Sequence, residues 1–317
     1  MRARRGGRAE AGPGTRQGRG HPGEPVRARR QGYGYGGALV RAVRRAERKP
    51  RVSQQSRLAN TFAAARAENR AALIGYLPAG YPDLAGSIEV CRTMVESGCD
   101  IVEVGVAYSD PVMDGPTIQA AADQALRGGV RVRDVFSVVE AITAAGGQAV
   151  VMSYWNPVLK YGVDRFARDL AAAGGAGIIT PNLIPEEADD WFVASSTHNL
   201  DRIFLVAPSS TEERLVKTLE ASRGFIYAAS TMGVTGARDM VSSAAPALCA
   251  RIRAHSDIPI GVGLGVRSGA QAAEIAGYAD GVIVGSALVS AAASGLDAVR
   301  ALTAELAEGV RAATVRS

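Results

Sequence analysis

The sequence predicts an α/β protein of the (β/α)8 TIM-barrel class, a single domain behind a basic N-terminal extension. Eight short apolar runs recur along the chain, each followed by helical sequence. The runs are almost continuously hydrophobic, as parallel strands covered on both faces are, and eight such units over about 250 residues fit a barrel. An open doubly wound sheet is the alternative. The first run lacks a following G-x-G-x-x-G motif, so a dinucleotide-binding fold is the weaker choice.

Turns and helix-start residues mark the first half of the chain. The strands are expected at residues 72–77, 100–106, 148–154 and 176–180, with helices at about 84–97, 117–127, 132–145, 163–173 and 185–195. A Gly/Pro turn, PAGYPD, separates the first strand from its helix. Glu186 and Glu187 begin the helix after the fourth strand, where carboxylates interact favourably with a helix N-terminus.

The second half of the chain repeats this alternation. Its strands are expected at residues 202–207, 224–229, 258–263 and 281–286. One helix is expected from about 211, another near 240–254, a third between the last two strands, and a final helix closes the chain. Each apolar run has the length of a buried strand, which supports eight strand–helix units.

Charge divides the chain into two unlike segments. Residues 1–51 contain 15 Lys and Arg and 3 Glu, a local balance of +12, whereas residues 52–317 contain 21 basic and 28 acidic residues, a balance of −7. The first segment is rich in Arg, Gly and Pro and poor in aliphatic residues, so it cannot bury enough surface to offset its ordering entropy. We expect a disordered arm at 1–51 and a catalytic barrel domain at 52–317.

Three explanations fit the arm. Its composition is typical of nucleic-acid-binding tails. A targeting peptide fits less well, because the arm has no apolar h-region and contains acidic residues. The explanation that we favour is a start site assigned too early, with translation beginning at Val52, and we therefore expect no nucleic-acid partner.

Composition also bears on location. No apolar stretch approaches the roughly 18 residues that span a bilayer, so we expect no membrane partner. The three cysteines are too few and too scattered for a disulfide framework or a zinc site. We expect a cytoplasmic protein.

Glu103 is an acidic residue inside the second apolar run, between Val102 and Val104. Both faces of a barrel strand are covered, so this carboxylate is buried whichever way it points. Burial without a partner favours the protonated form, and such groups gather at functional sites. The alternative is a structural glutamate that pairs with a Lys or Arg elsewhere in the chain.

The loop after this run, SDPVMDGP, lies at the carboxyl end of its strand, where barrel enzymes hold their active sites. Asp110 and Asp114 both precede turn-forming residues and could simply hold backbone N–H groups. Two carboxylates at one barrel mouth can, however, divide acid and base duties. We therefore expect Glu103 and Asp114 to form a catalytic pair and Asp110 to shape the turn.

Two glycine-rich segments favour a phosphate site at the last two strands. GVGLGVRSG (261–269) and VGSAL (284–288) bring glycines to the carboxyl end of a strand, directly before a helix. Backbone amides at a helix N-terminus bind phosphate, and barrels usually hold phosphate at this place. Tight strand-to-helix turns would require the same glycines. Residues 230–240, STMGVTGARDM, could form a mobile lid or a plain surface loop.

The positions of the histidines argue against several chemistries. His21 lies in the arm, and His198 and His255 follow predicted helices, so none falls in the expected catalytic loops. The sequence does not support a Ser–His triad, a histidine-ligated metal or a nucleotide P-loop, and we expect no metal site.

Together the motifs resemble one family. VEVGVAYSDPVMDGPTIQ, YLPAGYPD, SYWNPV, NLIPEEAD, STMGVTG, GVGLGVRS and VGSALV occur in the order found in tryptophan synthase alpha chains, over about residues 55–317. The resemblance implies a barrel that cleaves indole-3-glycerol phosphate to indole and glyceraldehyde 3-phosphate. It also implies an α2β2 heterotetramer, in which a beta chain uses the indole to make L-tryptophan. Pyridoxal phosphate would belong to the beta chain, and this chain would need no cofactor.

The resemblance also assigns roles to single residues. Glu103 matches the catalytic glutamate of the family, and Asp114 matches the catalytic aspartate. The substrate-contacting positions would be Tyr76, Met152 and Tyr154 for the indole, Tyr227 beside the site, and Gly236, Gly265, Gly285 and Ser286 for the phosphate.

Three positions depart from the family pattern. Ala107 stands where the family usually has proline, Asn182 where it usually has aspartate, and Thr231 where the lid often has arginine. Losing a proline loosens a loop, here the loop that carries Asp114, and Asn182 removes a charge near the barrel mouth. Two other functions therefore stay open: a stand-alone indole-releasing lyase, and a weakly catalytic subunit that mainly activates a beta chain.

Overall fold

The structure is a computed structural model in which residues 56–229, 244–263 and 265–312 are described. In these ranges the strands are β1 (Ala72–Pro78), β2 (Ile101–Gly105), β3 (Gln148–Met152), β4 (Gly177–Ile179), β5 (Asp201–Ile203), β6 (Leu205–Val206), β7 (Ile226–Ala229), β8 (Ile260–Gly263) and β9 (Gly281–Val284). They form one parallel sheet with the order β5-β4-β3-β2-β1-β9-β8-β7-β6. This order brings the first strand beside the last, as a barrel requires, and the predicted fold class is confirmed.

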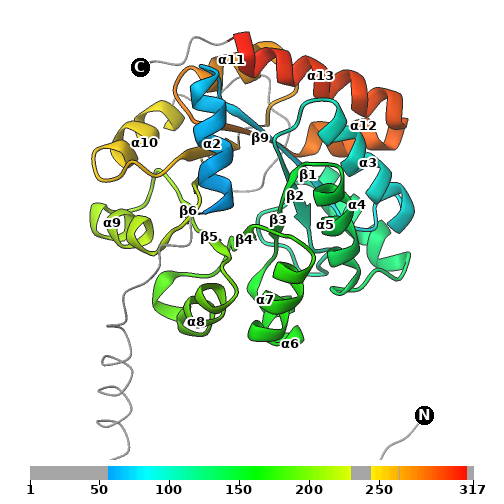
Figure 1. Cartoon of the computed structure of the whole chain (residues 1–317), viewed down its shortest axis with the longest axis horizontal. Helices are drawn as coiled ribbons and strands as arrows, with labels where there is room; N and C mark the ends of the chain where they lie inside the picture. Colours follow the sequence, from blue (N-terminus) through cyan, green and yellow to red (C-terminus); the bar gives the residue numbers. More distant parts are fainter. Residues whose placement is uncertain (1–55, 230–243, 264, 313–317) are drawn as a thin grey trace, which may run out of the picture. The chain divides into compact units, whose positions relative to one another are not determined.

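Helices surround this sheet (Figure 1). They are α2 (Arg57–Ala67), α3 (Leu84–Glu96), α4 (Pro116–Arg127), α5 (Asp134–Ala144), α6 (Trp155–Tyr161), α7 (Val163–Ala172), the 3₁₀ turn η1 (Pro185–Glu187), α8 (Asp189–Thr197), α9 (Glu212–Ala221), α10 (Ala244–Arg253), α11 (Gly269–Ala276), α12 (Ser286–Ser294) and α13 (Leu296–Ala312). Within the described ranges none of them is long and apolar enough to cross a membrane. The predicted arm at 1–51 and the predicted lid at 230–240 lie outside the described residues.

Two helices, α2 and α6, were not among the predicted elements. The single closing helix was also wrong, because the structure has two helices there, α12 and α13, separated at Gly295. Helix α2 begins after Ser56, whose hydroxyl accepts the N–H of Ala59, and it buries Leu58 and Phe62. Helix α6 includes Pro157 in its first turn, where a missing N–H costs nothing because the first helical N–H groups have no partner within the helix. Proline and a length of seven residues make such a helix look like a loop in the sequence.

The fifth predicted strand, 202–207, was wrong as a single element. The structure has two short strands, β5 and β6, separated by Phe204. Strand β5 pairs with β4 and β6 pairs with β7, so the two hydrogen-bond ladders do not overlap along the chain. Phe204 is buried and its carbonyl still accepts the N–H of Tyr227 (3.1 Å). The two edges of the sheet are therefore joined through Phe204.

The core has two layers that follow the alternation of side chains along each strand. In β2, Val102 and Val104 belong to the layer between the strands and the outer helices, whereas Ile101 belongs to the barrel interior. Glu103 lies between the two valines and therefore points into the barrel. The interior layer contains Ile74, Ile101, Val150, Ile179, Ile203, Phe225 and Ile283, together with Leu58 and Phe62 of α2.

Helix α2 lies across the N-terminal ends of the strands (Figure 1) and is held there by a buried carboxylate. Asp201, at the start of β5, accepts hydrogen bonds from the Ser56 hydroxyl (2.6 Å) and the Leu58 N–H (3.4 Å), and its other oxygen lies 3.0 Å from Nε of Arg223. Phe62 packs against Phe225 with ring centroids 5.4 Å apart. Packing and polar contacts thus close this end of the barrel.

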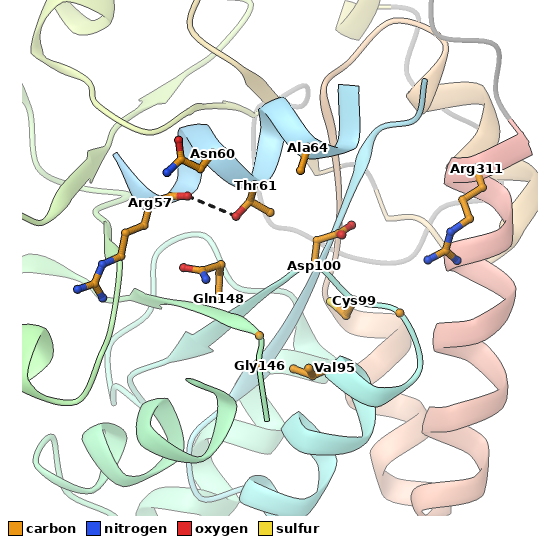
Figure 2. A pocket seen from close by; sticks show the side chains of 12 residues that line it. Arg57, Asn60, Thr61, Ala64, Val95, Cys99, Asp100, Gly146, Gln148 and Arg311 are labelled. Carbon is orange, nitrogen blue, oxygen red and sulfur yellow. Dashed lines mark hydrogen bonds between the residues drawn. The ribbon is translucent and has the colours of Figure 1, made fainter. Parts of the chain in front are cut away.

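A second ion pair, partly buried, lies at the same end. Arg70 binds Asp100 through two hydrogen bonds of 2.7 and 2.8 Å, and the N–H of Leu73 donates to the same carboxylate. Asp100 is also at the edge of a pocket of about 570 Å³ beside α2, into which Thr61 and Gln148 project (Figure 2). Arg70 therefore neutralises the carboxylate that borders this pocket.

Candidate active site

Glu103 is in the middle of β2, with Tyr76 of β1 and Val150 of β3 as its neighbours in register. Its side chain is 2% exposed, and Oε2 has no hydrogen-bond partner among the described residues. Burial raises the pKa of Glu103 to about 8, and the negative charge of Asp114 adds to this effect. No Lys or Arg pairs with Glu103 within the described ranges, and its raised pKa favours the protonated form at neutral pH.

Asp114 is in the loop between β2 and α4, directly before the N-terminus of the helix at Gly115. It is 8% exposed, and its backbone carbonyl accepts a hydrogen bond from the Gln119 side chain (2.7 Å). Burial raises the pKa of Asp114, and a hydrogen bond from Tyr154 opposes that rise by favouring the ionised form. Among the described residues, Asp114 therefore has a polar partner for its charge and Glu103 has none.

Tyr154 fixes the loop that carries Asp114. Its hydroxyl oxygen accepts the backbone N–H groups of Val112 (3.1 Å) and Met113 (3.0 Å). A tyrosine hydroxyl has two acceptor lone pairs and one proton to donate, so the two amides leave the proton for Asp114. The hydroxyl therefore holds two successive amides of the loop and lies near enough to the carboxylate of the next residue, Asp114, to affect its pKa.

Tyr76 and Tyr227 face the same space as the two carboxylates. Burial raises the pKa of each tyrosine, and the charges of Asp114 and Glu103 raise both further. Each hydroxyl occupies room left by a glycine on the next strand: a Cβ at Gly105 would collide with Tyr76, and one at Gly263 would collide with Tyr227. Four residues that the sequence analysis selected are therefore brought together.

Gly105 and Gly263 were not among the predicted site residues. A glycine inside a strand can signal a close approach by another group, and Gly105 follows Glu103 by two residues. The approaching group was not identifiable from the sequence, because a tyrosine and the glycine diagonal to it become neighbours only when the strand register is known.

The remaining predicted contacts fall at the same end of the barrel. Met152 ends β3, in register with Gly105, and its side chain is half-buried. Gly285 precedes Ser286, the first residue of α12, and a Cβ at Gly285 would lie 3.8 Å from the ring of Tyr76. The proposed phosphate amides therefore adjoin the proposed indole pocket.

Gly265 is a predicted phosphate position at the carboxyl end of β8. Gly265 follows β8 with φ +68°, a left-handed conformation that glycine adopts without strain. The next helix, α11, begins after Ser268, whose side chain accepts the N–H of Gln271. Gly236 and Thr231 lie outside the described residues.

Asp110, His198 and His255 make hydrogen bonds at the surface of the molecule. Asp110 is exposed and accepts a hydrogen bond from the Ser109 hydroxyl, which fits the predicted role in the turn. In the described part of the chain no three His, Cys, Asp or Glu side chains are grouped as metal ligands. His198 and His255 instead hydrogen-bond to exposed carboxylates, those of Asp164 and Glu212.

Comparison with known proteins identifies the family. The family model for the tryptophan synthase alpha chain matches residues 62–315. The chain is 93% identical over 266 residues to the tryptophan synthase alpha chain of Nocardia farcinica (strain IFM 10152), which covers 84% of this chain and 100% of the relative. It is 71% identical over 259 residues to that of Mycobacterium tuberculosis (strain ATCC 25618 / H37Rv), covering 82% and 96%.

Solved structures agree with these relatives. A structure of Mycobacterium tuberculosis tryptophan synthase matches with a TM-score of 0.79 at 70% identity, over 81% of this chain and 99% of that chain. Tryptophan synthase subunit alpha from Legionella pneumophila str. Paris matches with a TM-score of 0.72 at 30% identity, over 81% and 98%. The chain therefore belongs to the tryptophan synthase alpha chain family, and its activity is the lyase reaction that cleaves indole-3-glycerol phosphate to indole and glyceraldehyde 3-phosphate.

Proposed function

We propose that Glu103 and Asp114 perform this cleavage, with Glu103 as the proton shuttle and Asp114 as the charge stabiliser. The observation that supports these roles is the contrast within the pair. Glu103 is buried without a charge partner in the described ranges and has a pKa of about 8, whereas Asp114 is bonded to Tyr154. Two carboxyl groups whose environments differ in this way divide into an acid and a base.

The proposed reaction begins at indole C3. The protonated Glu103 donates its proton to C3, which leaves the ring as an indoleninium and Glu103 as a carboxylate. That carboxylate then removes the proton of the side-chain hydroxyl next to C3. The O–H electrons form the aldehyde, the C3–C bond breaks, and its electron pair restores the indole ring. Glu103 ends protonated, so one residue serves as acid and then as base.

Asp114 acts on the other side of the ring. The positive charge that develops on the indole nitrogen is stabilised by an ionised carboxylate that accepts the ring N–H. A fixed acceptor is more effective than a mobile one, because no reorganisation is needed as the charge appears. The bonds from Tyr154 to Val112, Met113 and Asp114 supply that rigidity.

The substrate would span two regions of the barrel mouth. Tyr76, Met152 and Tyr154 would line the indole, with Tyr227 beside it, and the amides at Gly265, Gly285 and Ser286 would bind the phosphate. The short distance from Gly285 to the ring of Tyr76 supports a continuous site of this kind, and Gly236 would contribute from outside the described residues.

The experiment for these roles is turnover of indole-3-glycerol phosphate by purified chains. Glu103→Gln and Asp114→Asn should each lower indole release by at least about 10²-fold, the low end for acid–base groups. Unchanged far-UV circular dichroism would show that both variants fold. Near-normal indole release by either variant would overturn its assigned role.

The cofactor and partner follow from the same proposal. We infer that this chain needs no cofactor, and that pyridoxal phosphate is held by a beta chain in an α2β2 complex in the cytoplasm. An exposed apolar group beside the site supports a docking face, since Val112 is 69% and Leu159 of α6 51% exposed. A hollow of about 650 Å³ is lined by residues 107–110 of the same loop and by the first turn of α6.

Adding a beta chain separates the possible functions. A beta-activated subunit should release indole much faster in the complex than alone, and size-exclusion chromatography with mass detection would give the stoichiometry. High activity alone with no response to the beta chain would indicate a stand-alone lyase. Negligible turnover in both states would indicate a regulatory subunit. Val112→Asp should weaken the complex and leave turnover by the isolated chain within about twofold.

A further inference from the structure

The N-terminus of α6 contacts the catalytic loop at two places. Tyr154, the residue before the helix, binds the backbone of Val112 and Met113 and the carboxylate of Asp114. Two residues later, the Asn156 side chain donates to the hydroxyl of Tyr108 (3.3 Å), and the rings of Tyr108 and Tyr154 pack with centroids 5.4 Å apart. The position of this helix start therefore sets the position of the loop.

The helix start is itself held from another strand. Asn182, in the loop after β4, accepts the backbone N–H of Trp155 through its Oδ1 atom (2.8 Å). That N–H is one of the first of α6, which have no partner inside the helix, and the residue at the N-cap, Tyr154, makes no side-chain cap. Asn182 thus supplies from a neighbouring loop the cap that α6 lacks.

We propose that Asn182 is a positioning residue for Asp114. The connection runs through two contacts: Asn182 holds the Trp155 N–H, and the adjoining residue Tyr154 holds Asp114 and the two amides before it. Without the cap, the first turn of α6 frays and Tyr154 loses its fixed place. The effect falls on the chemical step, because Asp114 acts on the charge that develops in the transition state. This inference rests on the role proposed for Asp114.

The test compares two substitutions in the full-length chain. Asn182→Ala removes the acceptor and should lower kcat about fivefold, the scale of a lost helix cap, with KM changed less than twofold. Asn182→Asp keeps an oxygen acceptor at the same place and should restore kcat to within about twofold of wild type. The matched control is Thr211→Ala, which removes the N-cap of α9, where Thr211 accepts the N–H of Arg214 (3.3 Å). Its kcat should stay within about twofold of wild type.

A spectroscopic signal reports on the contact independently of turnover. Trp155 and Trp191 are the two tryptophans of the chain, with ring centroids 6.3 Å apart at 64°. Asn182→Ala should change the near-UV circular dichroism of this pair, and Thr211→Ala should not. An unchanged near-UV spectrum and unchanged kcat in Asn182→Ala would overturn the inference, as would equal losses of kcat in Asn182→Ala and Thr211→Ala.

A double-mutant cycle separates this inference from the role of Asp114. In an Asp114→Asn background, Asn182→Ala should cost no further turnover, because the group that it positions is already disabled. A full additional fivefold loss in that background would contradict the positioning role and leave the role of Asp114 intact. Near-normal turnover by Asp114→Asn alone would instead refute the role of Asp114 and, with it, this inference.

Discussion

The two ends of the barrel both bury carboxylates but treat them in opposite ways. At the N-terminal end, Asp100 is bound twice by Arg70, and Asp201 is held by Ser56 and Arg223. At the C-terminal end, the carboxylates of Glu103 and Asp114 are buried without an arginine or lysine partner among the described residues. Burial raises the pKa of Asp201 as it raises those of Glu103 and Asp114, but Ser56 and Arg223 oppose the rise at Asp201. No cation among the described residues opposes it at Glu103 or Asp114.

This difference separates stability from chemistry. A carboxylate paired with arginine stays ionised and contributes hydrogen bonds, but it has no proton to give at neutral pH. An unpaired buried carboxylate costs stability when it ionises, yet it can hold and release a proton near pH 7. Charge pairs lie where helix α2 closes the barrel, and none of the described residues pairs with the carboxylates at the mouth, so stability and proton transfer are served at different ends.

Breaking a pair at the N-terminal end should have the largest effect on stability. Arg70→Met leaves Asp100 partly buried with one backbone donor, and we expect a loss of about 2–3 kcal/mol in the free energy of unfolding. Denaturant unfolding measures this, and kcat should be unchanged. Arg92→Met is the control, because the Arg92–Glu89 pair is exposed and should be worth less than about 0.5 kcal/mol. A comparable loss in both variants would remove the contrast between the two ends.

Substitution at the N-terminal end should change stability, whereas the catalytic activity at the barrel mouth should depend on pH. Cleavage begins with a proton from Glu103, so kcat should fall above pH 8, about tenfold per pH unit. A profile of indole release between pH 6 and pH 10 measures the decline. A kcat that stays constant up to pH 10 would show that no group with the pKa of Glu103 donates the proton.

The N-cap of α2 should contribute less to the free energy of unfolding than the Arg70–Asp100 ion pair. Ser56→Ala removes both the helix cap and a hydrogen bond to Asp201, and we expect a loss of about 1 kcal/mol in stability with unchanged turnover. Thermal unfolding measures it, with Asn60→Ala on the exposed face of the same helix as the control. If turnover fell in Ser56→Ala in proportion to stability, the two ends would not be independent.

The smallest effect is expected at Ala107, beside the mouth. Its N–H donates no hydrogen bond within the described residues, so a proline there would remove none. Ala107→Pro should stabilise the chain by about 0.4–1 kcal/mol through the unfolded state. Calorimetry measures the shift in Tm, and a destabilised variant would show that the loop backbone does not accept the proline ring.

Some of this site could be predicted from the sequence and some could not. Glu103 was recognisable because one carboxylate in a run of valines has to be buried in a barrel strand. Asp114 followed from its place at the end of the same strand. The contacts of Tyr154 with the loop and of Asn182 with α6 could not be predicted. They join residues that are 27 to 42 positions apart in the chain. No local pattern encodes such contacts.

The fold shows the same limit. Continuous apolar runs were sufficient to place the strands, since burial on both faces is a property of each run by itself. The break at Phe204 was invisible, because Phe204 is as apolar as its neighbours and only the pairing partners change there. Helix α6 was missed because Pro157 reads as a loop signal, although its place in the first turn is compatible with a helix.

The most direct test of the account is the stability of wild type and Glu103→Gln as a function of pH. Between the unfolded pKa of glutamate, about 4.3, and the folded value of about 8, the folded chain keeps a proton that the unfolded chain has lost. The unfolding free energy of wild type should therefore keep its full value, as far as Glu103 determines it, below about pH 4, and should decline as the pH rises to about 8. Glu103→Gln has no titrating carboxyl group at this position. Its unfolding free energy should therefore exceed that of wild type by an amount that grows over this window to on the order of 3–5 kcal/mol. Its indole release should stay at least about 10²-fold lower than that of wild type. A difference in unfolding free energy that does not change between pH 5 and pH 8 would contradict the account.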